Sequence, residues 1–369
     1  MAWAEKYVSV AGGGAHDGSS EANAWTLAEA IAAPYAAGDR VNVKAGTYAN
    51  TTTTRTFGVA GTTTAPIWWR GYNSTIGDLD ADFTTAKPAI TFTTGVFDIT
   101  GSFHLFSNFD ISGAQVTAGQ VRIRVGTNSR IDRCRVECTS ANSLGKAISL
   151  AAVGAGATRC WLKCTSSADV VACPSGFEGD VIGCAIINGA DGISLEAALR
   201  MTIAFNTFID QGANAVISNS GSRFWFLNNS VYSPAGDGIN LITTIPALAV
   251  VANNIFSECG VYGINNATGA NSATIFRSNN DFYASGTANE TGFGDYPSLS
   301  EQTESSSPFT SSTNMTIPNS RNAIANGLPG LFENQSYTSY MDIGAVQRVE
   351  PSGGGGLIRH PGMTGGLNG

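Results

Sequence analysis

A short pattern of apolar and polar positions recurs along the middle of the chain. An apolar residue, two arbitrary positions, Asn or Cys, one further position and a second apolar residue appear as VIGCAI, IAFNTF, FLNNSV and VANNIF, with weaker copies on either side. The shared polar or thiol positions are Cys134, Cys164, Cys184, Asn206, Asn229, Asn254 and Asn280. Their successive spacings are 30, 20, 22, 23, 25 and 26 residues. A repeat of this length predicts stacked structural units.

A second apolar pattern keeps the same register. Ile193, Val216, Ile239 and Ile264 follow the shared position by 9 or 10 residues in each copy. Two in-phase apolar strands per repeat, separated by Gly and Asn turns, predict one coil of a parallel β-solenoid. The period-two alternation and the glycine content exclude a helical solenoid. The predicted fold is therefore all-β, a single-stranded right-handed parallel β-helix.

Stacking has a direct consequence for the shared positions. Neighbouring coils hydrogen-bond at about 4.8 Å, so equal positions form columns along the stack. We expect Asn206, Asn229, Asn254 and Asn280 to form an internal ladder whose amides bond to one another and to turn backbone. Cys134, Cys164 and Cys184 are expected in the same column as small apolar groups. Because they lack the paired spacing of zinc ligands, the sequence predicts no metal site and no cofactor.

The two ends of the chain differ from the repeats. Residues 25–33, WTLAEAIAA, predict a short helix whose face of Trp25, Leu27, Ala28 and Ile31 covers the apolar end of the solenoid. The expected organisation is an N-terminal strand and capping helix over 1–40, coils over 41–290, an irregular closing lobe over 291–347 and a Gly-rich tail over 348–369. The tail carries a short apolar and cationic peptide, predicted as an assembly contact: Leu357, Ile358, Arg359, His360, Pro361 and Met363.

Composition narrows the class of protein. With 44 Gly and 13% charged residues the chain is unsuited to helices. The formal net charge of −8 disfavours a nucleic acid partner, and no apolar run is long enough for membrane insertion. The seven Cys are an odd number and cluster in sequence, which indicates reduced thiols. The first residues lack the basic and apolar segments of a signal peptide, so export is not expected.

Three segments carry a family resemblance. KYVSVAGGGAHDGSSEANAWTLAEAIAA with AGDRVNVKAGTY, then GTTTAPIWWRGYN, and MDIGAVQ near the other end resemble the entry, second coil and closure of right-handed parallel β-helix proteins of the pectate-lyase-like superfamily. With the repeats, the resemblance covers roughly residues 5 to 347. It implies the fold. Because this fold carries lyases, hydrolases, epimerases and virion spikes, it does not imply one activity.

Two columns of polar residues are candidates for catalysis. Aligned coils place Asp191, Asn214, Asp237 and Tyr262 in one column, and Asn188, Asp210, Ser233 and Glu258 in another. Asp191 and Asp237, like Asp210 and Glu258, are two coils apart, at about 9.6 Å. This separation is near the upper limit for an inverting glycosidase, about 9.5 Å. Since Asp before Gly is also a turn signal, the alternative is that these carboxylates serve the turns.

A basic segment, VRIRVGTNSRIDRCRVE, is the other candidate. It holds Arg122, Arg124, Arg130, Arg133 and Arg135 in an otherwise acidic chain. Alternation predicts that Arg122 and Arg124 point outward, where an arginine ladder binds an anionic glycan or pairs with acidic groups of another subunit, or is only solvated charge. A lyase also requires a cation beside carboxylates that hold calcium, and Lys146 and Lys163 have no acidic motif beside them.

These observations leave three functional hypotheses. Because a signal peptide is not apparent and the thiols are expected to be reduced, the first is a phage virion surface protein, a tail spike, fibre or head decoration. It would fold in the host cytoplasm and be released by lysis, with no enzymatic activity, a homotrimer and other virion proteins as partners, and host surface glycan as a candidate ligand. The second is an extracellular polysaccharide lyase or inverting glycoside hydrolase. The third is a bacterial surface adhesin.

Overall fold

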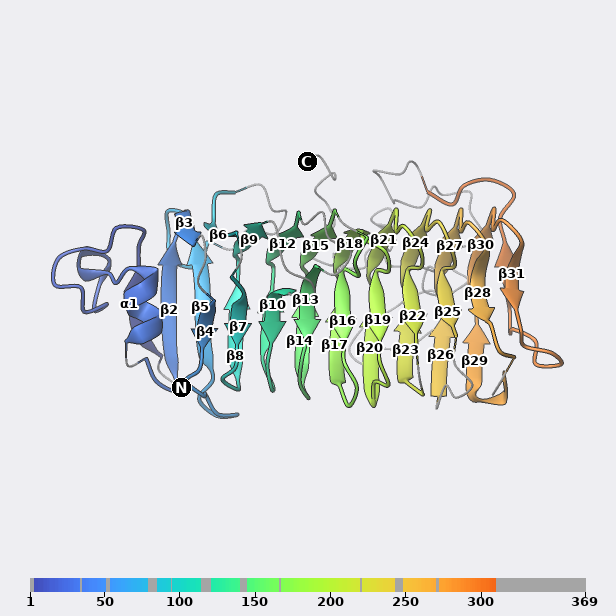
Figure 1. The fold of residues 1–369 in the computed structure, drawn as a ribbon, viewed down its shortest axis with the longest axis horizontal. Helices are drawn as coiled ribbons and strands as arrows, with labels where there is room; N and C mark the ends of the chain where they lie inside the picture. Colours follow the sequence, from blue (N-terminus) through green and yellow to red (C-terminus); the bar gives the residue numbers. More distant parts are fainter. Residues whose placement is uncertain are drawn as a thin grey trace, which may run out of the picture. The chain divides into compact units, whose positions relative to one another are not determined.

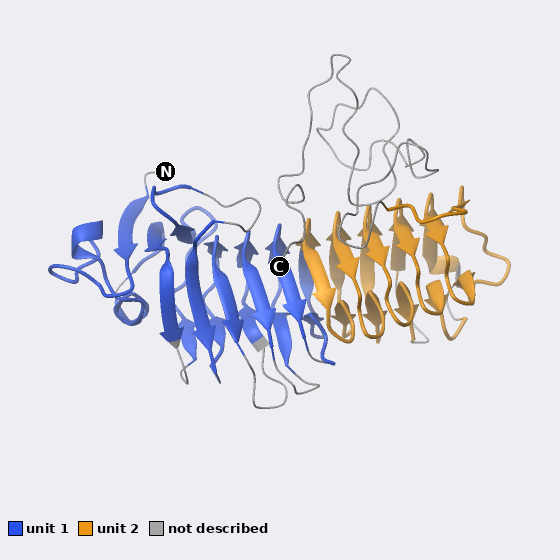
Figure 2. Ribbon diagram, turned by 90° about the horizontal axis from the view of Figure 1, so that it is seen from above, with its two compact units in different colours: residues 1–180 blue, residues 181–369 orange. Residues whose placement is uncertain are grey.

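The chain folds almost entirely into β-strands. The structure, a computed structural model, describes residues 3–33, 35–50, 54–78, 85–93, 95–113, 121–139, 145–165, 167–219, 221–242, 248–269 and 272–309. The chain divides into two compact units, with the boundary between Asp180 and Val181 (Figure 2). Parallel strands form three sheets in each unit, here called A, B and C. The predicted fold, a right-handed parallel β-helix, is confirmed.

In the first unit, strands of successive coils lie side by side within each sheet (Figure 1). Sheet A contains β1 (Ala4–Val8), β2 (Asp39–Lys44), β5 (Ile67–Tyr72), β8 (His104–Ser107), β11 (Arg130–Asp132) and β14 (Ala155–Thr158). Sheet B contains β3 (Gly46–Asn50), β6 (Pro88–Phe92), β9 (Asp110–Gly113), β12 (Arg135–Cys138) and β15 (Trp161–Cys164). Sheet C contains β4 (Arg55–Phe57), β7 (Phe97–Ile99), β10 (Val121–Val125), β13 (Lys146–Leu150) and β16 (Val171–Cys173).

The second unit repeats this arrangement. Sheet A contains β20 (Arg200–Ala204), β23 (Arg223–Leu227), β26 (Leu248–Ala252) and β29 (Ile275–Ser278), and β17 (Glu178–Ile182) includes the boundary between the units. Sheet B contains β18 (Ala185–Asn188), β21 (Thr207–Ile209), β24 (Ser230–Tyr232), β27 (Ile255–Ser257), β30 (Asp281–Tyr283) and β32 (Gln302–Thr303). Sheet C contains β19 (Ile193–Leu195), β22 (Val216–Ser218), β25 (Ile239–Leu241), β28 (Tyr262–Asn266) and β31 (Ala288–Thr291). A short 3-10 helix, η2 (Ser272–Thr274), precedes β29.

Each coil contains three strands, whereas the apolar pattern predicted two. The recurring motif spans the end of a sheet A strand and the start of a sheet B strand, with one left-handed residue between them. Phe205, Asn228 and Asn253 hold this position with φ of 57°, 52° and 58°. A left-handed residue bends the chain sharply, so a segment that reads as one strand becomes two. The second predicted column is sheet C, where Ile193, Val216, Ile239 and Ile264 are paired in register.

The capping helix lies at the N-terminal end beside β2 (Figure 1). It follows a 3-10 turn, η1 (Glu21–Asn23), and as α1 it spans Leu27–Ala32, shorter than the predicted 25–33. Thr26 and Glu29 form a capping box that fixes its first turn. Leu27 and Ala30 are buried, while Ala28, expected on the buried face, is exposed. Trp25 is buried too, but it lies before the helix in a bridge to Val8.

The four ladder asparagines of the second unit are fully buried and lie in one hydrogen-bonded column. Their Nδ2 atoms donate to Oδ1 of the next asparagine at 3.0, 3.1 and 3.0 Å, from Asn206 through Asn229 and Asn254 to Asn280. The same Oδ1 atoms accept the backbone N–H of the preceding ladder residue at 2.9, 2.8 and 3.1 Å. Each coil is thereby tied to the next through buried polar groups that are satisfied.

The cysteines require one correction. All seven lie in the described part of the chain, are buried and form no disulfide. Cys184 donates its backbone N–H to Asn206 Oδ1 at 2.9 Å, which places it at the start of the ladder column. In the first unit Cys134 neighbours Cys160. Cys164, expected in this column, instead pairs with Cys138 in sheet B, because the strands on both sides of Cys134 pair with strands 26 residues later, which places Cys160 at the column position.

The remaining C-terminal expectations fall largely outside the described residues. Of the closing lobe, residues 291–309 are described and contain one two-residue strand, β32, and Phe309, which packs on Tyr232. The Gly-rich tail with its predicted assembly contact, and the MDIGAVQ segment, lie outside them. The proposed division into four regions stays a prediction. Within the described residues, every helix is too short to cross a bilayer.

Candidate functional site

The carboxylates predicted for catalysis lie in the turns that join sheet B to sheet C in the second unit. Asp191 Oδ1 accepts from Asn214 N and Nδ2 at 3.0 and 2.8 Å, and Asn214 Oδ1 accepts from Asp237 N at 3.0 Å. Asp237 in turn accepts from Tyr262 N at 3.0 Å and from Asn265 Nδ2 at 2.8 Å. Burial raises the pKa of Asp191 and of Asp237, and these hydrogen bonds oppose it. Both carboxylates hold turn backbone.

The second predicted column occupies the other end of the same turns. Asn188, Asp210, Ser233 and Glu258 are all left-handed, with φ between 54° and 57°. Burial raises the pKa of Asp210, and its hydrogen bond with Ser233 opposes this change. A column of left-handed residues marks a corner that every coil repeats. The structure brings the four candidates together as two structural columns, and their catalytic role stays a prediction.

The five arginines of the basic segment lie in the first unit and differ in exposure. Arg122 is fully buried, with Nη1 donating to the Gly95 carbonyl at 3.2 Å, although alternation predicted an outward side chain. Arg124 is exposed and pairs with Asp98 at 3.1 Å. Arg130 binds Asp180 through two hydrogen bonds, and Arg133 contacts Asp132 at 3.1 Å. The positive charge of the basic segment is thus largely neutralised by acidic groups of its own chain.

Arg135 pairs with Glu137 and belongs to a partly exposed cluster on sheet B that we call the tryptophan–cation face: Asp110, Arg135, Glu137, Trp161 and Lys163. On β12 and β15 the inward residues Val136, Cys138, Leu162 and Cys164 are buried, so the alternate residues face outward. Strand register places Asp110, Arg135 and Trp161 in one row and Glu137 beside Lys163 in the next.

The contacts within this face are close. The Arg135 guanidinium lies 4.5 Å and the Lys163 ammonium 5.6 Å from the centroid of a Trp161 ring. Glu137 joins the two cations, at 3.4 Å from Arg135 Nη2 and 3.2 Å from Lys163 Nζ. Burial raises the pKa of Asp110, while the charges of Arg135 and Lys87 oppose it. The arrangement is an aromatic platform with two cations at its edge.

Sheet B of the second unit offers no equivalent among its described residues. Its outward positions on β21, β24 and β27 include Thr207, Ser230 and Ile255, which are all buried. On β12 and β15 the side chains of Arg135 and Lys163 are 34% and 23% exposed. A ligand can therefore reach the outward side chains of β12 and β15 in the first unit.

The donor set of this face does not fit calcium. Its two carboxylates, Asp110 and Glu137, each lie beside cationic side chains, and calcium takes six to eight oxygen ligands. Elsewhere in the described ranges, no group of three His, Cys, Asp or Glu side chains is arranged to hold a metal. Arg135 and Lys163 beside the Trp161 ring can instead bind the carboxylate of a ligand whose own ring packs on the indole.

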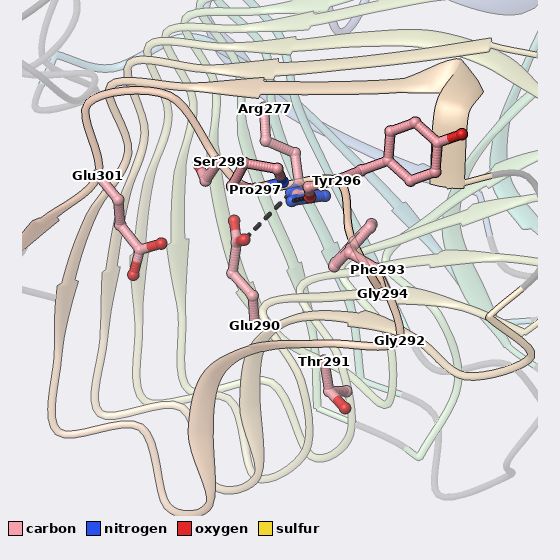
Figure 3. Close-up of a pocket in the computed structure, with 10 residues that line it drawn as sticks. All are labelled: Arg277, Glu290, Thr291, Gly292, Phe293, Gly294, Tyr296, Pro297, Ser298 and Glu301. Atoms are coloured by element: carbon pink, nitrogen blue, oxygen red, sulfur yellow. Dashed lines mark hydrogen bonds and ion pairs between the residues drawn. The ribbon is translucent and has the colours of Figure 1, made fainter.

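A second arrangement, at the last described coils of the second unit, was not predicted from sequence. A pocket of about 400 Å³ is lined by Arg277, Glu290, Phe293, Tyr296, Ser298 and Glu301, with loop residues between them. Arg277 Nε donates to Glu290 Oε2 at 3.1 Å, Nη2 donates to the Tyr296 carbonyl, and the guanidinium lies 3.5 Å from the Phe293 centroid. Figure 3 shows this ion pair and the Tyr296 ring directed away from it.

The Glu290 carboxyl gives a pH prediction. Burial, with a contribution from Glu301, raises its pKa from 4.5 to about 7, although Arg277 and Ser298 oppose the change. The folded chain then binds this proton more tightly than the unfolded chain, so the free energy of unfolding falls as pH rises from about 4.5 to 7 and is level above that. The expected loss is about 3 kcal/mol. Urea unfolding at pH 5 and pH 8 measures it, and in Glu290→Gln the difference should shrink by that amount. An unchanged pH dependence in the variant would contradict the assignment.

Sequence reasoning missed Trp161 and the Arg277–Glu290 pair for different reasons. Trp161 directly precedes a buried leucine in WLKC, so alternation marks it as outward, and an outward tryptophan beside a lysine was an available signal. Arg277 on β29 and Glu290 on β31 belong to one coil, in which the repeat pattern has faded. Nothing in their local sequence indicates that the loop from Gly292 to Ser298 encloses them.

The fold places the chain among known proteins. No protein-family model and no curated protein matches the sequence. Among solved structures, it is similar to a pectate lyase, with a TM-score of 0.60, 14% identity and coverage of 94% of this chain and 96% of that one. A rhamnogalacturonan lyase gives 0.61 and 14%, over 81% and 86%. A mannuronic acid specific polysaccharide lyase from human gut microbiota gives 0.50 and 13%, over 82% of each chain. The chain therefore has the parallel β-helix fold of pectate lyase and other polysaccharide lyases.

Proposed function

We propose that the chain is a polysaccharide lyase that cleaves an acidic glycan, with the tryptophan–cation face as its substrate-binding surface. The observation that carries the proposal is the position of Arg135 and Lys163 against Trp161 on an accessible sheet face. The apolar face of a sugar ring packs on an indole, and a uronate places its carboxylate at the edge of that ring.

The similar solved structures support this hypothesis over a phage virion protein. The three with the fold similarity given above are polysaccharide lyases by name. None of these comparisons points to a virion, a spike or a trimer. Because the identities are low, the similarity supports the fold directly and the activity only through the chemistry of the face.

The residues of the face can carry β-elimination. Arg135 neutralises the uronate carboxylate, which makes the proton on C5 more acidic. The Lys163 amine accepts that proton, a double bond forms between C4 and C5, and the C4–O bond breaks. The leaving oxygen then takes the proton from Lys163, so the amine is restored. Glu137, 3.2 Å from Lys163 Nζ, positions the side chain.

Gel retardation tests binding first. The chain should be retarded in gels that contain polygalacturonate, polymannuronate or rhamnogalacturonan, and not in gels with neutral dextran. Trp161→Ala should remove the retardation, whereas Trp225→Ala, a partly exposed tryptophan on β23, should leave it unchanged. Equal mobility in acidic and neutral gels, or equal effects of the two substitutions, would argue against this surface.

The carboxylates in the turns give a contrasting prediction. Because Asp191 and Asp237 accept backbone hydrogen bonds, Asp191→Asn and Asp237→Asn should change cleavage by no more than about twofold, while lowering stability by about 1 kcal/mol. Cleavage rates and urea unfolding of both variants measure this. If either variant lost cleavage while keeping the stability of the wild type, the substituted aspartate would be a catalytic residue.

A further inference from the structure

We propose that the pocket lined by Arg277, Glu290 and Ser298 binds an uncharged sugar residue through two neighbouring hydroxyl groups. This site lies within the second unit and does not rest on the proposed lyase activity. Its ligand also differs from the acidic glycan assigned to the tryptophan–cation face.

Polar atoms without partners point to a ligand here. Arg277 is 4% exposed, yet its Nη1 has no hydrogen-bond partner among the described residues. The same holds for Glu290 Oε1 and Ser298 Oγ; the serine hydroxyl lies near the carboxylate and lowers its pKa without reaching hydrogen-bond geometry. Buried polar atoms are nearly always paired, so three orphans in the lining of one pocket require an explanation.

The orphan atoms form a complementary set. Arg277 Nη1 is a donor, Glu290 Oε1 is an acceptor, and Ser298 Oγ can be either. Of two adjacent hydroxyls on a sugar ring, one can accept from the guanidinium while the other donates to the carboxylate. A single carboxylate ligand would satisfy only the guanidinium, and an ammonium ligand only the carboxylate.

The charges select an uncharged ligand. Arg277 is balanced by Glu290, and a further carboxylate, Glu301, lines the same pocket and raises the pKa of Glu290. The pocket therefore holds no surplus positive charge for a uronate. Its volume of about 400 Å³ lies within the range of small-molecule sites.

The guanidinium is fixed before any ligand binds. Its bond to Glu290, its bond to the Tyr296 carbonyl and its contact with the Phe293 ring leave Nη1 as the remaining donor. Such preorganisation reduces the entropy lost on binding.

Saturation-transfer NMR and calorimetry test the site with methyl glycosides of glucose, galactose, mannose and rhamnose, beside galacturonate and glucuronate. We expect the full-length chain with Trp161→Ala, in which the tryptophan–cation face no longer binds uronates, to bind at least one neutral glycoside, with the uronates about tenfold weaker or silent. Glu290→Gln and Ser298→Ala should each weaken binding about tenfold, whereas Glu196→Gln, an exposed carboxylate on another coil, should have no effect.

Each outcome decides the proposal. Binding of a neutral glycoside that falls in Ser298→Ala supports it even where Glu290→Gln perturbs the fold, since removal of a hydroxyl that has no partner within the described chain does not threaten folding. Absence of neutral glycoside binding, stronger binding of uronates, or equal binding by all variants would overturn it.

Discussion

Lys163→Met is expected to lower the rate of acidic glycan cleavage about a thousandfold, the scale of a lost acid–base group. Its side chain is partly exposed, its Nζ lies 3.2 Å from Glu137, and it packs over Trp161, so the substitution removes the amine and keeps the aliphatic contact. Binding in acidic gels should weaken much less than the rate, because Arg135 and Trp161 remain.

Lys44→Met is the matched control. Lys44 also lies in the first unit, is partly exposed and pairs with a carboxylate, Glu21, at 3.4 Å, but it has no tryptophan platform. The Lys44→Met variant should cleave acidic glycan at the rate of the wild type. If both lysine variants retained full activity, Lys163 would not be the base.

Asn229→Leu is expected to lower the free energy of unfolding by about 4 kcal/mol. Asn229 is fully buried and accepts from Asn206 N and Nδ2, while its own Nδ2 donates to Ile203 O and Asn254 Oδ1. A leucine of similar volume leaves the buried Asn206 N–H without its acceptor and removes the amide hydrogen bonds to Asn206 Nδ2, Ile203 O and Asn254 Oδ1. Urea unfolding followed by circular dichroism measures the change.

The control for the ladder is Asn219→Leu. Its Nδ2 donates to Glu196 Oε1 at 2.9 Å in an exposed hydrogen bond, so water replaces the lost partner. The expected change is about 0.5 kcal/mol or less. Equal losses in the two variants would show that burial of the ladder does not matter for stability.

The repeats predicted the fold because solenoid coils carry their register in local sequence. The spacing of Asn206, Asn229 and Asn254 follows from one buried amide per coil, and a buried amide tolerates few replacements. The same logic failed at Cys164, because a thiol, with no obligatory hydrogen bonds, gave no check on the alignment, and Cys160 holds the column position instead.

The tryptophan–cation face was harder to predict because its side chains come from separate coils. Arg135 belongs to the basic segment, and Lys163 was identified as a cation of the middle coils. Their contact with the same tryptophan, Trp161, depends on the register between β12 and β15. The burial of Arg122 likewise reflects a tertiary contact, with the Gly95 carbonyl, that alternation does not encode. The alignment of the coils placed Asp191 and Asp237 in one column. Their hydrogen bonds to turn backbone follow from the geometry of the turns, which the sequence does not show.

The central claim is tested most directly by ultraviolet absorbance during incubation of the chain with polygalacturonate, polymannuronate or rhamnogalacturonan, with reducing ends measured in parallel. Absorbance of the new C4–C5 double bond should rise in step with reducing ends on at least one of these polymers, and not in Lys163→Met. Reducing ends that appear without absorbance would indicate hydrolysis, and no change on any acidic polymer would contradict the lyase assignment.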